Sequence, residues 1–195
     1  MILKKKKLTI NLQNSCQKTK PFFIFEKNTA MSKNIILNNQ EIKHKTRRIA
    51  YQIYETFVDE EEVVIAGISK SGYVFAEKIA EALKAISSLK VSLCEVHIDK
   101  QNPSNEITTS LEKSQYENKG LVLVDDVLNS GTVLAYGIKF FLDVPLKKFK
   151  TAVLVDRNHK KYPVKADFKG ISLSTSLQEH VQVVFEENED YAYLS

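Results

Sequence analysis

The chain has 195 residues, of which 43% are hydrophobic and 27% are charged, a composition typical of one globular domain. This composition excludes a disordered chain, and the six glycines and four prolines exclude a collagen-like or proline-rich one. The two cysteines, Cys16 and Cys94, lack the spacing of a metal site or a disulfide framework, so we expect reduced thiols and a cytoplasmic protein. No apolar run approaches the roughly 18 residues that span a bilayer, so we expect no membrane partner.

The positive charge of the chain is concentrated at its N-terminus. Residues 1–30 carry seven lysines and one glutamate, a net charge of +6, whereas the remaining residues carry 21 basic and 23 acidic side chains, a net charge of −2. The segment lacks the apolar stretch of about 7 to 15 residues that a signal peptide needs. We predict a basic, disordered extension at 1–30, unless translation starts at Met31, and one domain at 31–195.

The first predicted elements are a helix, a strand and a second helix. Apolar or small side chains recur every three or four residues from residue 38 onward, with Asn39 as the expected N-cap. The helix positions that we expect to be buried are Ile42, Thr46, Ile49, Ile53 and Phe57. The β-branched run at 63–68 predicts a strand buried on both faces, and a polar SKSG turn and a helix at 73–85 follow it.

The second half of the chain repeats this alternation. The segments 91–98, 120–126 and 150–156 are predicted strands, a turn and helix follow the second of them, and short apolar runs occur at 171–176 and 181–186. Residues 99–118 are polar, and so long a loop suggests a function of its own. The alternation predicts an α/β fold, a doubly wound, mainly parallel sheet flanked by helices. Ligands of such sheets bind beyond the carboxyl ends of the strands.

One of these strand ends carries the strongest chemical signal. The apolar residues 121–124 lead directly into Asp125 and Asp126, which repel each other and therefore need hydroxyl groups or a cation such as Mg²⁺. The following turn, residues 129–132, directs backbone N–H groups and a helix N-terminus toward one point, as a phosphate site requires. Acids for a sugar beside amides for a phosphate predict a ribose 5-phosphate site. The simpler alternative is a strand end with an aspartate cap and a glycine turn.

The segment VLVDDVLNSGTV resembles the motif with which type I phosphoribosyltransferases bind 5-phosphoribosyl 1-diphosphate (PRPP). The segment VVIAGISKSGYVFAEKIAEAL resembles the strand, diphosphate loop and helix of that family. Three further segments, RRIAYQIYE, AVLVDRNHKKYPVKADFKG and STSLQEHV, resemble the branch of pyrimidine operon attenuator and uracil phosphoribosyltransferase proteins, PyrR. The resemblance begins near residue 38 and continues to residue 195, and it implies the type I phosphoribosyltransferase fold with a small C-terminal hood region.

The resemblance implies that ribose 5-phosphate passes from PRPP to a nucleobase, most plausibly uracil, with release of diphosphate and with Mg²⁺ as cofactor. The catalytic and metal-binding residues would be Asp125 and Asp126. The 5-phosphate would bind Asn129, Ser130, Gly131 and Thr132. The diphosphate would bind Ser69, Lys70, Ser71 and Gly72. Val155, Asp156 and Arg157 would lie beside the base, and residues 99–118 would form a flexible loop that closes over the reaction.

Four positions depart from the family pattern. Ser71 replaces an arginine of the diphosphate loop, Val133 replaces a threonine after the phosphate loop, and Leu177 replaces another arginine. Asn129 occupies the position of a carboxylate that accepts a proton in the 6-oxopurine enzymes, and an amide cannot do so.

These departures leave two alternatives to a uracil-specific enzyme. The first is an RNA-binding regulator of pyrimidine genes, although a domain of charge −2 offers few basic groups to neutralise RNA. Its basic face would consist of Lys43, Lys45, Arg47, Arg48, Lys160 and Lys161. The second is a sensor that binds PRPP or a nucleotide with little turnover. The resemblance also implies a homo-oligomer.

Overall fold

The computed structural model describes residues 34–157, 159–174, 179–186 and 189–195. The predicted basic extension at 1–30 and the substituted position Leu177 lie outside these residues. None of the helices in the described ranges is long and apolar enough to cross a membrane.

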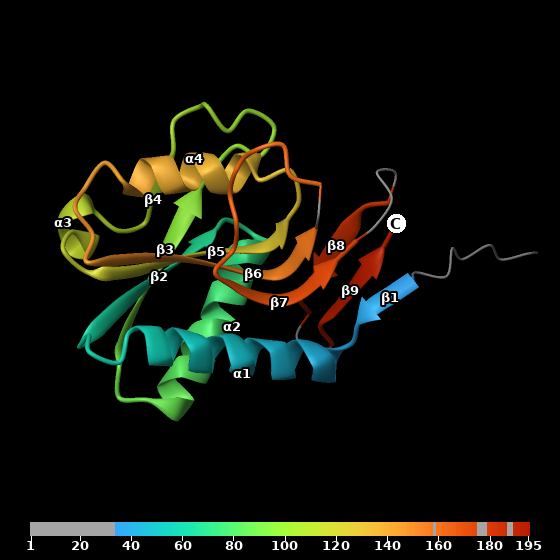
Figure 1. Ribbon diagram of the computed structural model, residues 1–195, viewed down its shortest axis with the longest axis horizontal. Coiled ribbons are helices and arrows are strands. Elements are labelled where there is room, and N and C mark those ends of the chain that lie inside the picture. Colours follow the sequence, from blue (N-terminus) through green and yellow to red (C-terminus); the bar gives the residue numbers. More distant parts are fainter. Residues whose placement is uncertain (1–33, 158, 175–178, 187–188) are drawn as a thin grey trace, which may run out of the picture. The chain divides into compact units, whose positions relative to one another are not determined.

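A six-stranded sheet with the order β4-β3-β2-β5-β6-β7 forms the centre of the fold (Figure 1). Its strands are β2 (Glu62–Ile68), β3 (Lys90–His97), β4 (Thr108–Thr109), β5 (Gly120–Leu128), β6 (Lys148–Arg157) and β7 (Phe168–Leu173). All neighbouring strands run parallel except β3 and β4. The predicted doubly wound, mainly parallel sheet is therefore confirmed.

Helices cover both faces of this sheet (Figure 1). Helices α1 (Asn39–Thr56) and α2 (Ser71–Ile86) lie on one face, and α4 (Thr132–Phe141) lies on the other. The short α3 (Lys113–Tyr116) packs against α4: the Tyr116 ring lies edge-on to the Phe141 ring, with 5.2 Å between their centroids. The apolar positions predicted for α1 are all buried, which confirms the helical periodicity.

The first helix begins one residue earlier than expected. Asn38, not Asn39, is its N-cap: the Asn38 side chain accepts a hydrogen bond from the Glu41 backbone N–H at 3.0 Å, and the Glu41 carboxylate accepts one from the Asn38 N–H at 2.9 Å. This reciprocal pair is a capping box, which needs Glu or Gln three residues after the cap. Glu41 meets that spacing from Asn38 and not from Asn39, so the expected cap was wrong by one position.

The order of the strands reverses between β2 and β5. The connection through α2 leads from β2 outward to β3, whereas the connection through α4 leads from β5 in the other direction to β6. The two loops that follow β2 and β5 therefore separate to opposite faces of the sheet. A crevice at the carboxyl ends of these two strands is where open α/β sheets bind their ligands.

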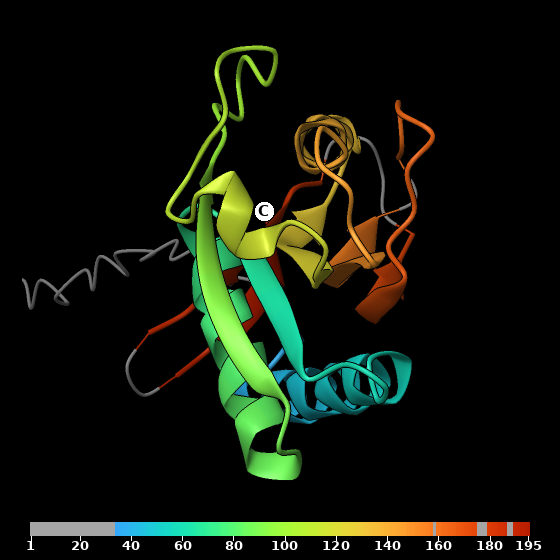
Figure 2. The same ribbon diagram turned by 90° about the vertical axis from the view of Figure 1, so that its left-hand side faces the viewer.

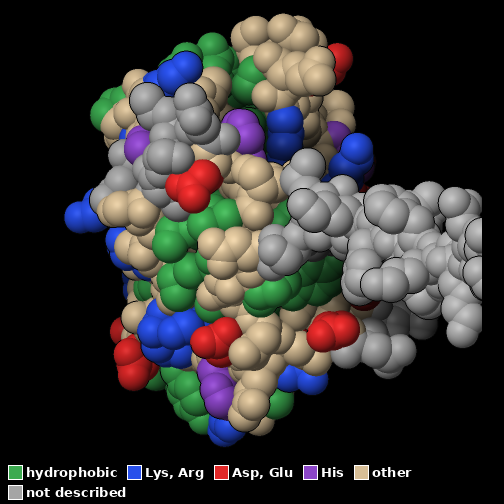
Figure 3. Space-filling model, turned by 90° about the vertical axis from the view of Figure 1, so that its right-hand side faces the viewer, with side chains coloured by type: hydrophobic (Ala, Val, Ile, Leu, Met, Phe, Trp, Pro, Cys, Tyr) green, Lys and Arg blue, Asp and Glu red, His purple; other side chains and the backbone are tan. Residues whose placement is uncertain are grey.

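A second, smaller sheet is antiparallel, with the order β1-β9-β8. Its strands are β1 (Asn34–Leu37), β8 (Val181–Val184) and β9 (Tyr191–Leu194). The resemblance implied a hood from the C-terminal region, and the structure differs because an N-terminal strand completes it. On this side of the molecule, hydrophobic side chains form a patch bordered by charged ones (Figure 3). The partly buried Val181, Val183 and Phe185 pack against the core below α1 and α2.

The polar segment 99–118 is only partly a loop. Its second half contains β4, which pairs with the end of β3, and α3, whose Tyr116 is 1% exposed. Only the first half protrudes, at the upper edge of Figure 2. Even there, the Asp99 carboxylate accepts hydrogen bonds from the Gln101 and Asn102 backbone N–H groups at 2.9 and 3.1 Å. The part of the segment that precedes β4 and lacks helix and strand is thus limited to residues 99–107.

Candidate functional site at the carboxyl ends of β2 and β5

The two predicted acids lie inside β5 and are largely buried. Asp125 is 5% exposed and Asp126 9% exposed, and the strand continues beyond them to Leu128. The acids lie in the predicted strand as expected, but the strand ends two residues later than the predicted end at Asp126. Because the β-sheet fixes their backbone, the two carboxylates cannot move apart to reduce their repulsion.

A lysine that the sequence analysis did not select forms ion pairs with both acids. The Lys100 Nζ lies 3.2 Å from Asp125 Oδ1 and 3.6 Å from Asp126 Oδ1. Lys100 follows β3, whose carboxyl end neighbours that of β2 in the sheet. The signal in the sequence was the acid pair's need for a cation, but only the fold identifies which of the lysines supplies it.

The charges of this cluster influence one another strongly. Burial, followed by the negative charge of Asp126, raises the pKa of Asp125 to about 8, against the opposing effect of Lys100. Burial alone would lower the pKa of Lys100, but the charges of Asp125 and then Asp126 outweigh it and raise the pKa. The site therefore favours a bound cation, and it disfavours two ionised carboxylates without one.

The predicted phosphate loop precedes α4 and is held in one conformation. Gly131 is the N-cap of α4 and has a left-handed backbone, with φ of 82°. The Ser130 and Thr132 hydroxyls lie 2.9 Å apart and hydrogen-bond to each other. The Ser130 carbonyl accepts hydrogen bonds from the Lys161 and Tyr162 backbone N–H groups at 2.8 and 3.2 Å. The Thr132 N–H also donates a hydrogen bond to Ser130 Oγ at 3.3 Å, so these contacts hold the loop hydroxyls at the N-terminus of α4, where an anion can bind.

A polar cavity of about 220 Å³ connects this loop to the acid pair. Its lining residues are Lys100, Asp125, Val127, Leu128, Asn129, Ser130, Gly131, Val133, Leu134 and Val153. The cavity thus brings together one of the two acids and three of the four predicted phosphate-binding residues. Val133, the position of the missing threonine, also lines it, so that substitution replaces a hydroxyl with a methyl group at the cavity wall.

The predicted diphosphate loop, residues 69–72, lies directly beside the acids. The Ser69 N–H donates a hydrogen bond to the Val96 carbonyl at 2.8 Å, and Lys70 has a positive φ of 67° although it carries a side chain. Such backbone conformations cost about 1–3 kcal/mol and persist where a site requires them. A Cβ atom placed on Gly72 would lie only 2.9 Å from Asp125 Oδ1. Glycine at this position lets the start of α2 approach β5 at the acid pair.

The residues predicted to lie beside the base have more restricted environments. Val155 is 0% exposed, and its side chain belongs to the hydrophobic core. Asp156 is 2% exposed and pairs with Lys160 and Lys169 at 2.9 and 3.1 Å. Arg157 does reach the site, since it donates a hydrogen bond to Asn129 Oδ1 at 3.1 Å.

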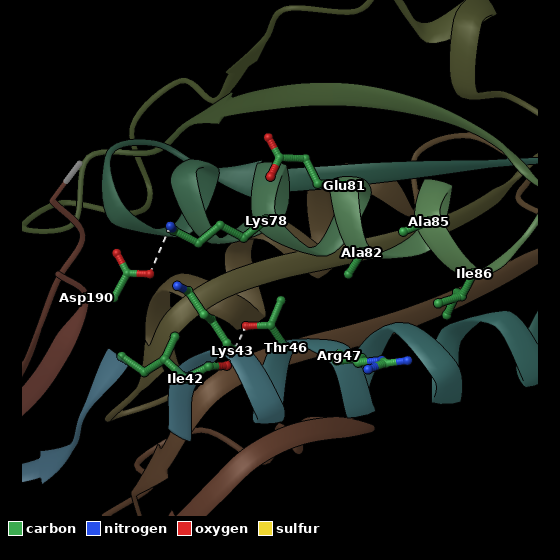
Figure 4. A pocket seen from close by; sticks show the side chains of 10 residues that line it. All are labelled: Ile42, Lys43, Thr46, Arg47, Lys78, Glu81, Ala82, Ala85, Ile86 and Asp190. Atoms are coloured by element: carbon green, nitrogen blue, oxygen red, sulfur yellow. Dashed lines mark hydrogen bonds and ion pairs between the residues drawn. The ribbon is translucent and has the colours of Figure 1, made fainter. Parts of the chain in front are cut away.

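Another hollow, of about 330 Å³, lies between α1 and α2 (Figure 4). Its side chains include Lys43, Arg47 and Glu81, and the Lys78–Asp190 ion pair of 2.9 Å closes one end. None of the residues that line it belongs to the predicted site. It lacks the combination of acids and anion-binding loops found at the strand ends, so we assign the functional site to the smaller cavity.

The sequence matches the Phosphoribosyl transferase domain family over residues 32–189. The chain therefore belongs to this family, which confirms the enzyme class. Among curated relatives, the bifunctional protein PyrR of Pediococcus pentosaceus is 30% identical over 165 residues, which cover 80% of this chain and 93% of the relative. The bifunctional protein PyrR of Streptococcus thermophilus is 32% identical over 160 residues, which cover 80% of this chain and 92% of the relative. The resemblance to the PyrR branch is therefore confirmed.

Solved structures of this class share the fold. The hypoxanthine phosphoribosyltransferase of Trypanosoma cruzi, in a variant complexed with its product IMP, has a TM-score of 0.68 at 16% identity and matches 83% of this chain and 89% of that one. A hypoxanthine-guanine phosphoribosyltransferase of Bacillus anthracis has a TM-score of 0.62 at 20% identity and matches 72% of this chain and 82% of that one. At this level of identity the likeness supports the fold and not the base.

Proposed function

We propose that this protein transfers ribose 5-phosphate from PRPP to a nucleobase, with uracil as the preferred acceptor, and releases diphosphate. One observation carries the proposal: two loops that bind anions in this family meet a buried acid pair at one crevice, with the Gly72 Cβ position 2.9 Å from Asp125 Oδ1. PRPP carries a phosphate, a ribose and a diphosphate in a row. The phosphate loop, the acids and the diphosphate loop form a matching row of sites.

The chain's own residues would each act on one part of PRPP. The N–H groups and hydroxyls at 130–132 would bind the 5-phosphate, and Asp125 and Asp126 would accept hydrogen bonds from the ribose hydroxyls. As the bond at C1 breaks, positive charge develops on the ribose ring, and these carboxylates stabilise it. Lys70 and the backbone of residues 69–72 would stabilise the negative charge of the leaving diphosphate. Residues 99–107 would exclude water, which competes with the base for C1.

The residues at this site fit a magnesium ion. Two buried carboxylates are the hard oxygen ligands that Mg²⁺ prefers, and Lys100 already marks the position where a cation is stable. Among the described residues, no group of three or more His, Cys, Asp or Glu forms a metal site, so substrate oxygens would complete the coordination. When bound, Mg²⁺ supplies positive charge that the diphosphate needs as it leaves.

The acceptor base is proposed from the relatives. The bifunctional PyrR proteins support uracil, because the pyrimidine branch resembles this chain in several separate segments. Asn129 supports a base other than that of the 6-oxopurine enzymes, because its amide replaces their proton-accepting carboxylate. The Asn129 Oδ1 atom accepts a hydrogen bond from Arg157 instead.

The test measures diphosphate released from PRPP and Mg²⁺ with uracil, hypoxanthine, guanine or orotate. Uracil should give the largest rate, and Asp126→Asn should lower that rate by about 100-fold or more, because it removes charge that stabilises the transition state. The matched control is Asp143→Asn, an exposed aspartate at the end of α4, which should leave the rate unchanged. Turnover with hypoxanthine alone would exclude uracil. Tight PRPP binding without turnover of any base would identify a sensor.

RNA regulation is the second candidate, because the curated relatives are named bifunctional. Part of the expected basic face is already committed within the protein: Arg48 donates hydrogen bonds to the Lys169 and Gly170 carbonyls at 2.7 Å, and Lys160 pairs with Asp156. Fewer of its cations therefore remain to neutralise RNA phosphates. RNA binding that persists without residues 1–30 and weakens steeply with salt would support this candidate.

A further inference from the structure

We propose that Lys100 is a displaceable counter-ion for the acid pair. Its ammonium group pairs with Asp125 and Asp126 while the site is empty, and it leaves when a divalent cation arrives with PRPP. The inference rests on the proposed function, because it assumes that these acids receive a metal–PRPP complex. It concerns a residue that the family motifs in the sequence do not include.

The geometry makes Lys100 a shared partner of both acids. Its Nζ lies 3.2 Å from one carboxylate and 3.6 Å from the other, a position between two ligands that a metal ion would also need. The Asp125 and Asp126 side chains are 7% and 12% exposed, whereas the Lys100 side chain is 44% exposed. The acids are therefore fixed, and only the lysine can move away into solvent.

Electrostatics require that the position between the acids holds a cation. Burying an unpaired carboxylate costs several kcal/mol, and two adjacent ones fixed in a strand repel each other as well. A divalent ion brings twice the positive charge of one ammonium group to the same position between the two acids. An ammonium group and a divalent cation repel each other at this distance, so the two cannot occupy the site together. Binding of the metal must therefore displace Lys100.

The position of Lys100 in the chain gives this exchange a consequence. Lys100 stands at the base of the protruding segment 99–107, directly after Asp99, whose carboxylate organises the following turn. While Lys100 is paired with the acids, it ties this segment to β5. Displacement of Lys100 releases that contact at the moment when the substrate arrives, which is when the segment has to cover the site.

The test measures the affinity of Mn²⁺ for the full-length protein by calorimetry, with and without PRPP, in the wild type and two variants. Lys100→Gln removes the competing charge, so Mn²⁺ should bind about tenfold more tightly than to the wild type. Lys100→Arg keeps the charge and can bind a carboxylate with two hydrogen bonds, so Mn²⁺ should bind several-fold more weakly. The two variants thus shift the affinity in opposite directions, and either one decides the question if the other does not fold.

The matched control is Lys150→Gln, which removes the lysine of an ion pair with Asp167 at 3.0 Å outside the site and should not change Mn²⁺ binding. Equal or weaker Mn²⁺ binding to Lys100→Gln, or equal or tighter binding to Lys100→Arg, would overturn the inference. A wild type that binds neither Mn²⁺ nor the Mn²⁺–PRPP complex would instead refute the proposed function. The two failures are therefore distinguishable.

Discussion

Asp125 combines two roles that oppose each other. Burial makes its negative charge unfavourable, and the same burial increases the strength of its interaction with any cation that reaches it. Its pKa of about 8 expresses the first effect, and its contact with Lys100 expresses the second. A surface aspartate would be easier to accommodate, but water would weaken its effect on the charge that develops on a ribose ring.

The raised pKa of Asp125 predicts how stability depends on pH. In the folded protein Asp125 keeps its proton up to about pH 8, whereas in the unfolded chain it loses the proton near pH 4. The folded protein therefore binds more protons within this window, and its stability falls as the pH rises, by at most about 1.4 kcal/mol per pH unit. Asp125→Asn abolishes this loss, so the variant should gain stability relative to the wild type between pH 5 and pH 8.

The measurement is the free energy of unfolding in urea at several pH values, in the presence of EDTA. Asp143→Asn serves as the control because Asp143 is exposed, and its curve should run parallel to that of the wild type. A parallel curve for Asp125→Asn as well would show that Lys100 keeps Asp125 ionised throughout.

Residues of the site could be predicted from the sequence where they lie close together in it. The acids and the phosphate loop lie within eight consecutive residues, so one segment displays both. Lys100 is 25 residues from Asp125 in sequence, and only the pairing of β3 with β2 and of β2 with β5 brings it near.

At the scale of elements, the junction between β5 and α4 depends on Gly131. Its φ of 82° lies in the left-handed region, and a Cβ atom there would lie 2.6 Å from the Val164 Cγ2 atom. Gly131→Ala should therefore lower the free energy of unfolding by about 1–3 kcal/mol through backbone strain and steric overlap. Urea denaturation measures this loss.

The double variant Gly131→Ala/Val164→Ala separates the two causes. It removes the overlapping methyl group but leaves the backbone strain, so Gly131→Ala should cost less in the Val164→Ala background than in the wild-type background. An equal cost in the two backgrounds would assign the whole effect to the backbone.

Elements with a strong periodic pattern were predicted, and short ones were not. The 18 residues of α1 show the helical period several times, and β2 is a continuous apolar run. The strands β1 and β9 have four residues each, too few to distinguish a strand from a loop, and β4 has two. Their pairing depends on partners elsewhere in the chain, which local sequence does not encode.

At the scale of the whole molecule, an ion pair links the small sheet to helix α2. Lys78 of α2 pairs at 2.9 Å with Asp190, the residue before β9, and the Asp190 side chain is 4% exposed while that of Lys78 is 32% exposed. Lys78→Gln leaves a buried carboxylate without its cation and also removes the contact of Lys78 with the Phe185 ring at 5.5 Å. It should cost about 2 kcal/mol of unfolding free energy, since partial exposure reduces the value for a fully buried pair.

Asp190→Asn is the matched partner of this variant. It should cost less, about 1 kcal/mol, because the lysine that it leaves behind can turn toward water. Thermal and urea unfolding of both variants check the order of the two losses. A larger loss for Asp190→Asn than for Lys78→Gln would show that the burial of the carboxylate does not determine the cost of breaking the pair.

The small sheet also constrains when the protein can finish folding. Asn34 pairs with Leu194 and Ile35 with Tyr193, so β1 cannot pair until β9, about 160 residues further along the chain, has been synthesised. During translation the α/β sheet can assemble as its units emerge, but β1 has no strand partner until β9 has left the ribosome. The nascent chain must therefore avoid pairing β1 with other strands over this interval, and the hood is the last part of the protein to form.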